Sequence, residues 1–547
     1  MIICTRYFCF FFCFSFSFSQ NEKDVLFTVS DSPVYMEEFH RVYNKNIDLI
    51  KDSDQRDVQT YLDLFINYKL KLAEAYSLDL HKENAYLKEL NKYAKQLQNS
   101  YLTDKKTEEK FLKEAYERTK YEVKVSHVLI RYSESDKDSI KIIQKLKNFR
   151  NDFLELNIDN FNKKHNKNNE YIVEDLGYFS AFKMIYNFEN VAYDTQIGEV
   201  SLPFKTRFGY HIIKVHDKRP SLGEINVGHI MIYKSKENSV EKINSVLDSI
   251  NKGASFEYLA KKYSEDKNSS FKGGRLNSFS SGQINSIPFE NAAFKLKNPG
   301  DISEVVETKY GWHIIKLYSK KNIQSYEEIK YELLNKLKKS SRFDFISDSF
   351  YESLLTKYNL SYENKELKYF DSIVDNSLLN ANWSMPEGIS DKTNMVAILN
   401  RTYSLLDFAD YLENNQSKNP KKSLYNVLRE KYRSFLNLKM LKIYKDNLEK
   451  ENADYRNVLN EYREGLLLFN LMQDKIWTYN ESDSLKLKDF FYKNSVNYKS
   501  FESDKGKIIG DYQEKLELEW IKELKLKYPV LINKKALRRI KKMYSYE

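Results

Sequence analysis

Short apolar runs of strand length open and close two stretches in the middle of the chain. These runs are rich in Val and Ile, as expected for single strands. Between them, residues 139–156 and 239–251 place apolar side chains three and four positions apart, the spacing of a helix with one buried face. A further helix is expected at 256–263 and a short strand at 275–279. The four strand-like runs are residues 123–130, 205–215, 225–232 and 307–317.

Helical spacing dominates both ends of the chain. An extended segment at 25–29 precedes the N-terminal helices, and the C-terminal region is mostly helical, with breaks near 362–380 and 416–420. Its last recognisable helix, at about 512–527, leads into residues 528–532, which have the composition of a strand. Two helical regions that bracket two α/β stretches predict that the chain ends pack together. The N-terminal helices are expected at 36–49, 54–78, 82–101 and 107–120.

The two middle stretches are copies of one another. Residues 123–130 and 205–215 reappear as 225–232 and 307–317, and each copy holds a Phe-Glu-Asn segment between its two runs. The paired histidines are 84 residues apart in both copies. A repeat of this length indicates two successive structural units of one fold. The residues that recur 102 positions later are His127 and His229, His211 and His313, and Thr206 and Thr308.

The composition limits the classes of protein that the chain can be. It has 547 residues, of which 41% are hydrophobic and 15% aromatic, so it can bury several cores and wholesale disorder is excluded. With only 15 Gly and 8 Pro, long helices are favoured over a glycine-rich β architecture. The net charge is +10, but the charges are interspersed, and we expect no nucleic-acid partner.

Residues 1–19 predict export. Arg6 precedes an apolar run from Tyr7 to about Phe18, and a polar segment follows, which is the pattern of a cleaved signal peptide. The run is too short for a spanning helix of about 20 residues, and an uncleaved anchor is the alternative. No later stretch is comparably apolar, so we expect no stable membrane span after the signal is removed.

The distribution of metal-binding and redox-active side chains argues against a metal or a cofactor. All three cysteines, Cys4, Cys9 and Cys13, lie within the expected signal peptide, so neither disulfides nor cysteine chemistry is expected in the exported chain. The eight histidines show no tight metal-binding spacing, and no glycine-rich phosphate loop occurs. We therefore expect neither a metal nor a cofactor.

Several motifs recur in the same order in both copies. The opening strands carry Ser126-His127 and Gly228-His229, the closing strands carry Gly-Tyr-His-Ile-Ile and Gly-Trp-His-Ile-Ile, and residues 175–179 read Asp-Leu-Gly-Tyr-Phe. With these motifs each copy resembles a parvulin-type (PpiC) peptidyl-prolyl cis-trans isomerase domain. Two tandem copies behind a signal peptide and a helical N-terminal region are similar to the SurA-like periplasmic chaperones of outer-membrane proteins.

The resemblance implies an α+β multidomain fold in an exported, periplasmic protein. Each parvulin-like unit would be a small antiparallel sheet with surrounding helices, and mainly helical regions would flank the pair. The expected divisions are the signal peptide at 1–19, a helical SurA-like region at 20–120, a first repeat unit at 121–220, a second repeat unit at 223–320 and a C-terminal region at 321–547.

Prolyl isomerisation needs a particular kind of site. Rotation about an amide crosses a barrier of about 18–20 kcal/mol because resonance is lost at the perpendicular geometry. No nucleophile and no proton transfer to the substrate are required. The catalyst needs an apolar pocket for the pyrrolidine ring and surroundings that favour the twisted, less charge-separated amide. Two facing imidazoles held by a Thr hydroxyl can set the polarity of such a pocket.

In the first repeat unit, the resemblance implies a histidine pair with a supporting hydroxyl and an apolar pocket. The acidic or thiol side chain that the family places about ten residues before the pocket Leu is absent, because residues 165–167 read His-Asn-Lys. This departure argues against full activity of the first unit. The implied residues are His127, His211 and Thr206 for the catalytic group and Leu176, Met184 and Phe188 for the proline pocket.

In the second repeat unit, the resemblance implies a complete polar group but an altered pocket. Asp266 stands ten residues before Leu276, where the family has its acid. The pocket Met is missing, and either Ile284 or Ile287 would supply that wall. The implied residues are His229, His313, Thr308 and Asp266 for the catalytic group and Phe289, Leu276 and one of the two isoleucines for the pocket.

These observations predict an exported peptidyl-prolyl cis-trans isomerase and chaperone. Its partners would be unfolded or partly folded exported proteins with X-Pro bonds, above all outer-membrane proteins, and its helical flanks would hold them. The alternative is a non-catalytic, peptide-binding chaperone or scaffold with degenerate parvulin units. A protein devoted to a single envelope partner is a third hypothesis.

Overall fold

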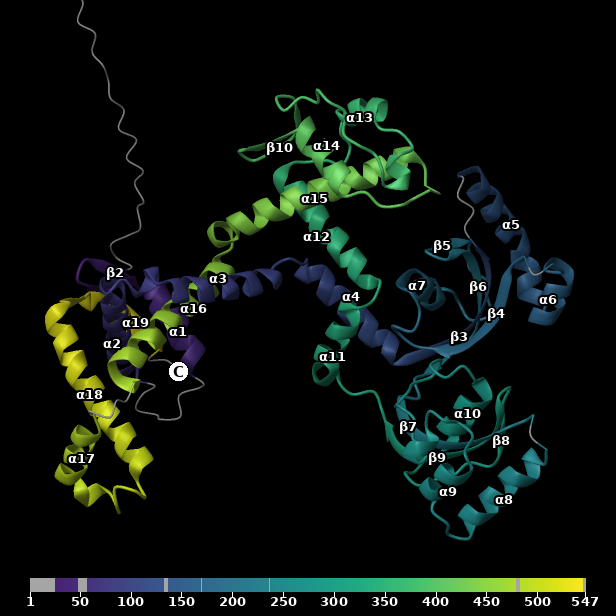
Figure 1. The fold of residues 1–547 in the computed structure, drawn as a ribbon, viewed down its shortest axis with the longest axis horizontal. Helices are drawn as coiled ribbons and strands as arrows, with labels where there is room; N and C mark the ends of the chain where they lie inside the picture. Colours follow the sequence, from purple (N-terminus) through teal and green to yellow (C-terminus); the bar gives the residue numbers. More distant parts are fainter. Residues whose placement is uncertain are drawn as a thin grey trace, which may run out of the picture. The chain divides into compact units, whose positions relative to one another are not determined.

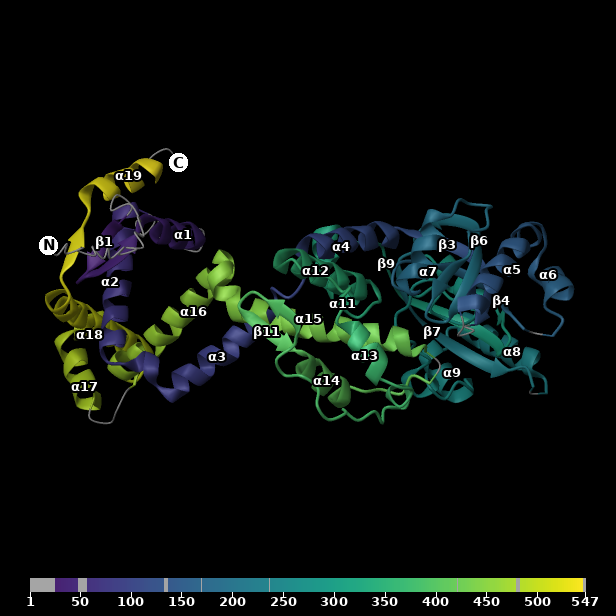
Figure 2. The ribbon, with the colours of Figure 1, turned by 90° about the horizontal axis from the view of Figure 1, so that it is seen from above.

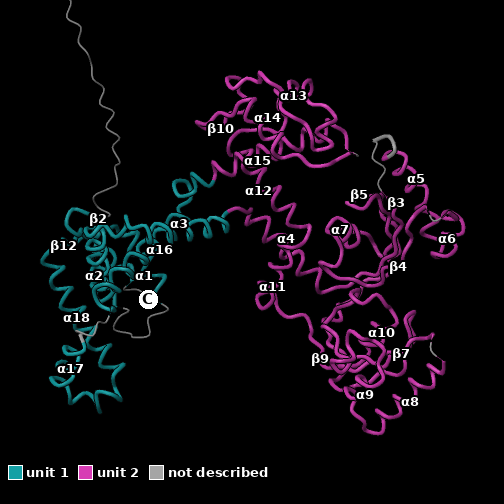
Figure 3. Tube along the Cα trace, viewed as in Figure 1, with its two compact units in different colours: residues 1–101, 445–547 teal, residues 102–444 magenta. Residues whose placement is uncertain are grey.

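The computed structural model describes residues 25–47, 57–131, 136–168, 170–235, 237–420, 422–478 and 483–544. The expected signal peptide at 1–19 lies outside these residues. The chain divides into two compact units, coloured separately in Figure 3. We call residues 1–101 with 445–547 the terminal unit, and residues 102–444 the central unit. The mixture of helices and small antiparallel sheets confirms the expected α+β class (Figure 1).

The two ends of the chain meet in the sheet of the terminal unit. Strand β1 (Val25–Val29) lies between β2 (Ser32–Tyr35) and β12 (Val530–Ile532), and both pairings are antiparallel. Leu26 and Phe27 of β1 are fully buried against residues of α2 and α19, and Figure 2 shows these elements together. The prediction that the chain ends pack together is confirmed. The helices of this unit are α1 (Met36–Asn46), α2 (Val58–Ser77), α3 (Asn84–Asn99), α16 (Ala453–Met472), α17 (Asp483–Lys493), α18 (Lys505–Lys527) and α19 (Lys534–Tyr544).

Helix α19 was not expected from the sequence. It reads KKALRRIKKMY, with apolar residues at the helical spacing of positions 536, 537, 540, 543 and 544, so the pattern could have predicted it. Its buried side chains are Ala536 and Ile540. The helix forms because these two side chains complete the core under β1 and α2. None of the helices in the described ranges combines the length and the apolar character needed to cross a membrane.

The helical part of the central unit contains a β-hairpin that the sequence reading missed. Strands β10 (Asn394–Ile398) and β11 (Arg401–Ser404) pair antiparallel within a region expected to be mostly helical. Leu399, at the turn, has φ +54°, and this turn carries neither of the Asn-Gly and Asp-Gly pairs that mark such hairpins. The helices of this part are α4 (Lys105–Thr119), α11 (Tyr326–Lys338), α12 (Arg342–Tyr358), α13 (Leu367–Ile373), α14 (Leu405–Asn414) and α15 (Leu424–Glu451, shared with the terminal unit).

The first repeat unit is built on a four-stranded antiparallel sheet in the order β4-β3-β6-β5. One face packs against α5 and α6, through apolar side chains such as Phe149 and Phe161, and the other face packs against α7 through Phe188. The histidine strands β3 and β6 are the two central strands, which holds their side chains rigidly. The elements are β3 (Tyr121–Arg131), α5 (Asp136–Glu155), α6 (Ile158–His165), β4 (Ile172–Phe179), α7 (Tyr186–Asp194), β5 (Phe204–Thr206) and β6 (Gly209–Pro220).

The second repeat unit has the same plan with a smaller sheet, in the order β7-β9-β8. The strand expected at 275–279 is not a regular strand; it makes two isolated bridges, from Arg275 to Gly228 and from Phe279 to Ile225. Helices α8 and α9 cover one face and α10 covers the other. The elements are β7 (Glu224–Tyr233), α8 (Ser239–Asn251), α9 (Phe256–Tyr263), α10 (Ile287–Lys295), β8 (Val306–Glu307) and β9 (Gly311–Lys321).

Candidate functional site

The histidine pair of the second repeat unit joins its two main strands. His229 of β7 and His313 of β9 are both buried, and their rings stack with centroids 5.4 Å apart and planes 15° apart. The two Nδ1 atoms are 3.2 Å apart, so one ring donates a hydrogen bond to the other. The ring of Phe289, from α10, meets both imidazoles edge to face at 5.6 and 5.3 Å. The three rings form one compact group.

The outer nitrogens of this pair are held by polar side chains. His313 Nε2 lies 2.9 Å from Thr308 Oγ1, and His229 Nε2 lies 2.8 Å from Asp266 Oδ2. Ser269 Oγ is 3.1 Å from the same His229 nitrogen and also donates to Asp266. The structure therefore brings the four polar residues implied for this unit into one hydrogen-bonded chain.

The charge state of this chain follows from burial and hydrogen bonding. Burial, with a smaller contribution from His229, lowers the pKa of His313 to about 4, so this imidazole is neutral at pH 7. The hydrogen bond from His229 holds the pKa of Asp266 well below its usual range, with help from Ser269 and Asn268. The group thus combines a neutral ring over Phe289 with an ionised carboxylate at its far end.

The apolar wall beside these rings includes one of the two candidate isoleucines. Leu276 and Ile284 are half-buried and pack on the cluster around Phe289. Ile287 is 44% exposed, and a Cβ placed on Gly177 of the first repeat unit would lie 3.5 Å from its side chain. The structure therefore brings Ile284, and not Ile287, together with the other pocket residues.

The first repeat unit repeats this geometry. His127 Nδ1 and His211 Nδ1 are 3.3 Å apart, and His211 Nε2 lies 2.8 Å from Thr206 Oγ1. Phe188 of α7 meets the two imidazoles edge to face at 5.7 and 5.5 Å. The implied pocket residues Leu176 and Met184 pack on the cluster that contains Phe188.

Burial also controls the charge of the first histidine pair. It lowers the pKa of His211 to about 3, with a further contribution from His127. It lowers the pKa of His127 as well, while the charge of Glu174 acts in the opposite direction. Burial therefore favours the uncharged form of both rings of the first pair, as it does for His313 of the second.

The sequence reading missed two side chains of these sites. Ser269 stands three residues after Asp266, a spacing at which a hydroxyl can hydrogen-bond back to a carboxylate in a turn. Phe204 stands two residues before Thr206, and its ring stacks on His211 at 5.3 Å, whereas Val306 occupies the equivalent position in the second unit. The alternation of side chains along β5 could have indicated Phe204.

The position where the first unit lacks the family acid is also ordered. Asn166 is buried, donates to the carbonyl oxygen of Tyr171 at 2.9 Å and accepts from its N–H at 2.9 Å. His165 ends helix α6 and lies 2.6 Å from Asp152. The Asn166 side chain supports the chain before β4 and makes no hydrogen bond to His127.

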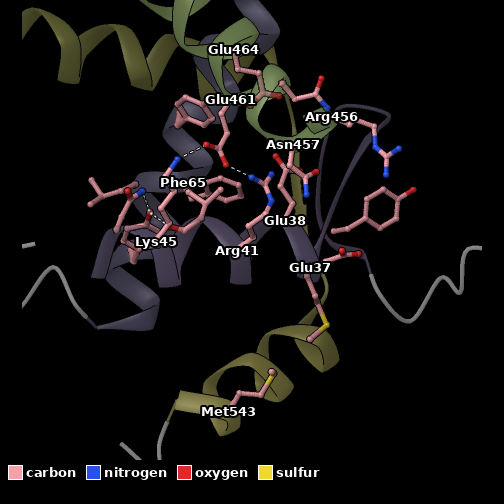
Figure 4. A pocket seen from close by; sticks show the side chains of 18 of the residues that line it. Glu37, Glu38, Arg41, Lys45, Phe65, Arg456, Asn457, Glu461, Glu464 and Met543 are labelled. Atoms are coloured by element: carbon pink, nitrogen blue, oxygen red, sulfur yellow. Dashed lines mark hydrogen bonds and ion pairs between the residues drawn. The ribbon is translucent and has the colours of Figure 1, made fainter. Parts of the chain in front are cut away.

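The terminal unit holds a separate cavity of about 1330 Å³. Its lining mixes apolar side chains such as Leu64 and Phe65 with charged ones. Glu461 pairs with Arg41 and with Lys45, the latter at 2.5 Å, and these contacts are drawn as dashed lines in Figure 4. The lining of this cavity therefore offers both apolar and charged side chains.

Comparisons with known proteins support the resemblance of the two repeat units to parvulin-type isomerase domains. Residues 127–217 and 217–321 each match the PPIC-type PPIase domain family, so the chain contains two tandem domains of this type. The Foldase protein PrsA 2 of Bacillus cereus is 40% identical over 146 residues, which are 26% of this chain and 49% of that protein. The Foldase protein PrsA 2 of Bacillus anthracis is 40% identical over 152 residues, which are 28% of this chain and 51% of that protein.

The crystal structure of the peptidylprolyl isomerase PrsA from Bacillus anthracis is 40% identical in the matched part, which covers 25% of this chain and 61% of that one, with a TM-score of 0.18. The chain spans about half the length of the curated relatives it matches. The part matched by these three proteins is about a quarter of this chain.

Proposed function

We propose that the protein is an exported peptidyl-prolyl cis-trans isomerase and foldase in which the parvulin units act on X-Pro bonds of unfolded clients. The observation that carries this proposal is the group of His229, His313 and Phe289, which recurs as His127, His211 and Phe188. The matched relatives are named foldases, and the solved one is named a peptidylprolyl isomerase. These names support the same activity for this chain.

The geometry supports a mechanism in which the polarity of the site, and no bond to the substrate, lowers the barrier to rotation. The pyrrolidine ring would lie on the apolar surface of Phe289, Leu276 and Ile284, which form one cluster. The neutral imidazole of His313 stands over this surface. A planar amide gains stability from charge separation, which water solvates well and a buried apolar surface solvates less well. The site therefore raises the energy of the planar amide relative to the twisted one.

The residues implied as site residues take two roles in this proposal. The histidines and threonines, with Asp266, would hold the polar network rigid and set its protonation. Phe289, Leu276 and Ile284 in the second unit, and Phe188, Leu176 and Met184 in the first, would bind the proline ring. We propose that the second unit is the more active one, because its carboxylate is hydrogen-bonded to the histidine pair.

The wider role that we propose follows the SurA-like organisation expected from the sequence. The regions 20–120 and 321–547 would hold clients while the repeat units at 121–220 and 223–320 isomerise them. The cavity of the terminal unit, with its mixed lining, supports binding of segments that are both apolar and charged. We propose a periplasmic location and outer-membrane proteins as the main clients. Mass spectrometry of the protein from an envelope fraction should then give an N-terminus near residue 20.

The test of the activity uses the full chain without its signal. The cis-trans exchange rate of a short X-Pro peptide is measured by NMR with the unaltered chain, with H229A, with H127A and with both substitutions. We expect acceleration by the unaltered chain, a larger loss in H229A than in H127A, and no acceleration by the double variant. No acceleration by the unaltered chain, with aggregation of an unfolded β-barrel client still suppressed, would instead support the non-catalytic chaperone.

A further inference from the structure

Glu174 of β4 lies directly opposite His127 of β3 in the antiparallel pair. Directly opposed residues project their side chains on the same side of a sheet. Glu174 Oε2 is 3.6 Å from His127 Nε2, the ring nitrogen that does not face His211. Within the described part of the chain, this buried nitrogen has no hydrogen-bond partner. A carboxylate therefore stands beside the one unsatisfied nitrogen of the first histidine pair.

The two repeat units supply a carboxylate from different positions. Asp266 of the second unit corresponds to Asn166 of the first, and Glu174 of the first unit corresponds to Gly274 of the second, each pair one hundred residues apart. Asn166 makes its hydrogen bonds to the backbone of Tyr171. Each unit thus has an acidic residue at one of the two positions and a non-acidic residue at the other.

The second repeat unit could not carry an acidic side chain at Gly274, the position that corresponds to Glu174. A Cβ on Gly274 would come within 2.4 Å of the backbone oxygen of His229, and Gly274 has φ +82°. A side chain there would clash with the strand that carries the histidine. In the first unit the corresponding Glu174 lies in a regular strand paired with β3, and its side chain is 60% exposed.

We propose that Glu174 is the positioning carboxylate of the first repeat unit and serves His127 as Asp266 serves His229. This inference rests on the proposed isomerase function and assigns the acid that the sequence of the first unit lacked at 165–167. It makes the first unit a complete site with its acid on a neighbouring strand.

The carboxylate would fix the direction of every hydrogen bond in the chain. A carboxylate only accepts, so His127 carries its proton on Nε2 and uses Nδ1 as an acceptor. His211 then donates from Nδ1, and its Nε2 accepts from the Thr206 hydroxyl, 2.8 Å away. Thr206 Oγ1 already accepts the N–H of Phe208 at 3.1 Å, which leaves its own proton free to donate. The whole sequence of donors and acceptors is consistent with a carboxylate at the Glu174 end.

A nitrogen-15 NMR experiment on the full chain, labelled at histidine, tests the assignment without relying on activity. We expect His127 to be protonated at Nε2 and His211 at Nδ1 at pH 7. In E174Q and E174A this tautomer of His127 should lose population, and the pKa of His127 should fall because a nearby negative charge has been removed. E170Q, the same charge change four residues earlier, should alter neither. A His127 protonated at Nδ1 in the unaltered chain, or unchanged by both Glu174 variants, would overturn the proposal.

A kinetic experiment adds the functional readout. In a chain whose second repeat unit is silenced by H229A and H313A, E174Q and E174A should lower kcat/KM for an X-Pro peptide about tenfold, because the negative charge 3.6 Å from His127 Nε2 is removed. E170Q should leave it unchanged. Full activity of both Glu174 variants would overturn the inference while leaving the isomerase function in place. If the silenced chain is inactive before Glu174 is changed, the isomerase function of the first unit fails, and the NMR result alone decides the role of Glu174.

Discussion

Phe182 and Gly282, one hundred residues apart, hold the same left-handed backbone conformation, with φ of +67° and +79°. Each donates its N–H to the Glu of the following helix, at 2.9 Å in both cases, to Glu189 in the first unit and Glu290 in the second. The loops before α7 and α10 are therefore equivalent residue by residue up to this point. Any extra residue of the second unit lies after Gly282.

This equivalence predicts which isoleucine binds the proline ring. Met184 and Ile284 both stand two residues after the left-handed position, and both pack on the pocket cluster. I284A should lower kcat/KM for an X-Pro peptide about tenfold, because about 1.4 kcal/mol of apolar contact with the substrate is removed. The matched control I287A, at the exposed neighbour, should leave kcat/KM within twofold of the unaltered chain. A larger loss of kcat/KM in I287A than in I284A would instead assign the pocket wall to Ile287.

Gly282 should tolerate a side chain less well than other glycines in the same conformation. A Cβ there would lie 2.6 Å from the backbone oxygen of Tyr178, so G282A combines backbone strain with a clash against the first unit. Gly198 has φ +88° and no atom within 4 Å of its Cβ position, so G198A measures strain alone. We expect a lower melting temperature for G282A than for G198A. Equal melting temperatures would mean that the two repeat units can move apart at Gly282 and Tyr178 without a loss of stability.

The buried ion pair of Arg342 with Glu189 should be essential to the central unit. Both side chains are fully buried, and Arg118 contacts the same carboxylate at 3.3 Å. R342A should destabilise the unit by about 3–5 kcal/mol, because a buried carboxylate loses a partner. Hydrogen exchange at β3 and α7 measures the effect.

A matched control separates burial from charge. Arg433 pairs with Asp348 at 3.0 Å, but these side chains are 41% and 60% exposed. R433A should therefore cost less than about 1 kcal/mol in the same measurement. A cost for R342A as small as that for R433A would contradict the role given to the buried pair.

Stability should fall in mildly acidic solution because of the buried histidines. His313 and His211 have pKa values of about 4 and about 3 in the folded chain, against 6.5 for an ordinary histidine. Between pH 6.5 and 4 the unfolded chain binds protons that the folded chain does not, so each histidine lowers the free energy of unfolding by about 1.4 kcal/mol per pH unit. Thermal unfolding from pH 7.5 to 4.5 measures this slope.

A substitution identifies the source of that slope. H313Q cannot titrate and should flatten the pH dependence of the second unit. The carboxyl of Asp266 has a lowered pKa, so its contribution is complete above pH 3.8 and is lost only at lower pH. Asp266 therefore contributes little to the slope between pH 6.5 and 4. An unchanged slope in H313Q would show that other groups cause it.

The sequence predicts the histidine pairs because the repeat carries their positions twice. The two histidines of each copy are 84 residues apart, and a separation that recurs in both copies indicates that they meet in the fold. In the structure the two Nδ1 atoms of each pair lie 3.3 and 3.2 Å apart. The repeat could not decide whether Ile284 or Ile287 supplies the pocket wall, because the offset between the two copies changes within this loop. Backbone dihedral angles resolve this, and they cannot be read from side-chain identities.

Features that depend on long-range pairing could not be predicted from local patterns. The proximity of Glu174 to His127 follows from the register of β4 on β3, and the contact of Arg342 with Glu189 joins residues 153 positions apart. In each case the decisive partner lies in another element.

The most direct test of the central claim is where a proline ring binds. Intermolecular nuclear Overhauser effects are measured between an X-Pro peptide and the full chain labelled at Phe and Ile methyl or ring positions. The account predicts contacts from the proline ring protons to Phe289 and Ile284, lost in F289A and retained in I287A. Contacts to residues remote from His229 and His313, with none to Phe289, would contradict it.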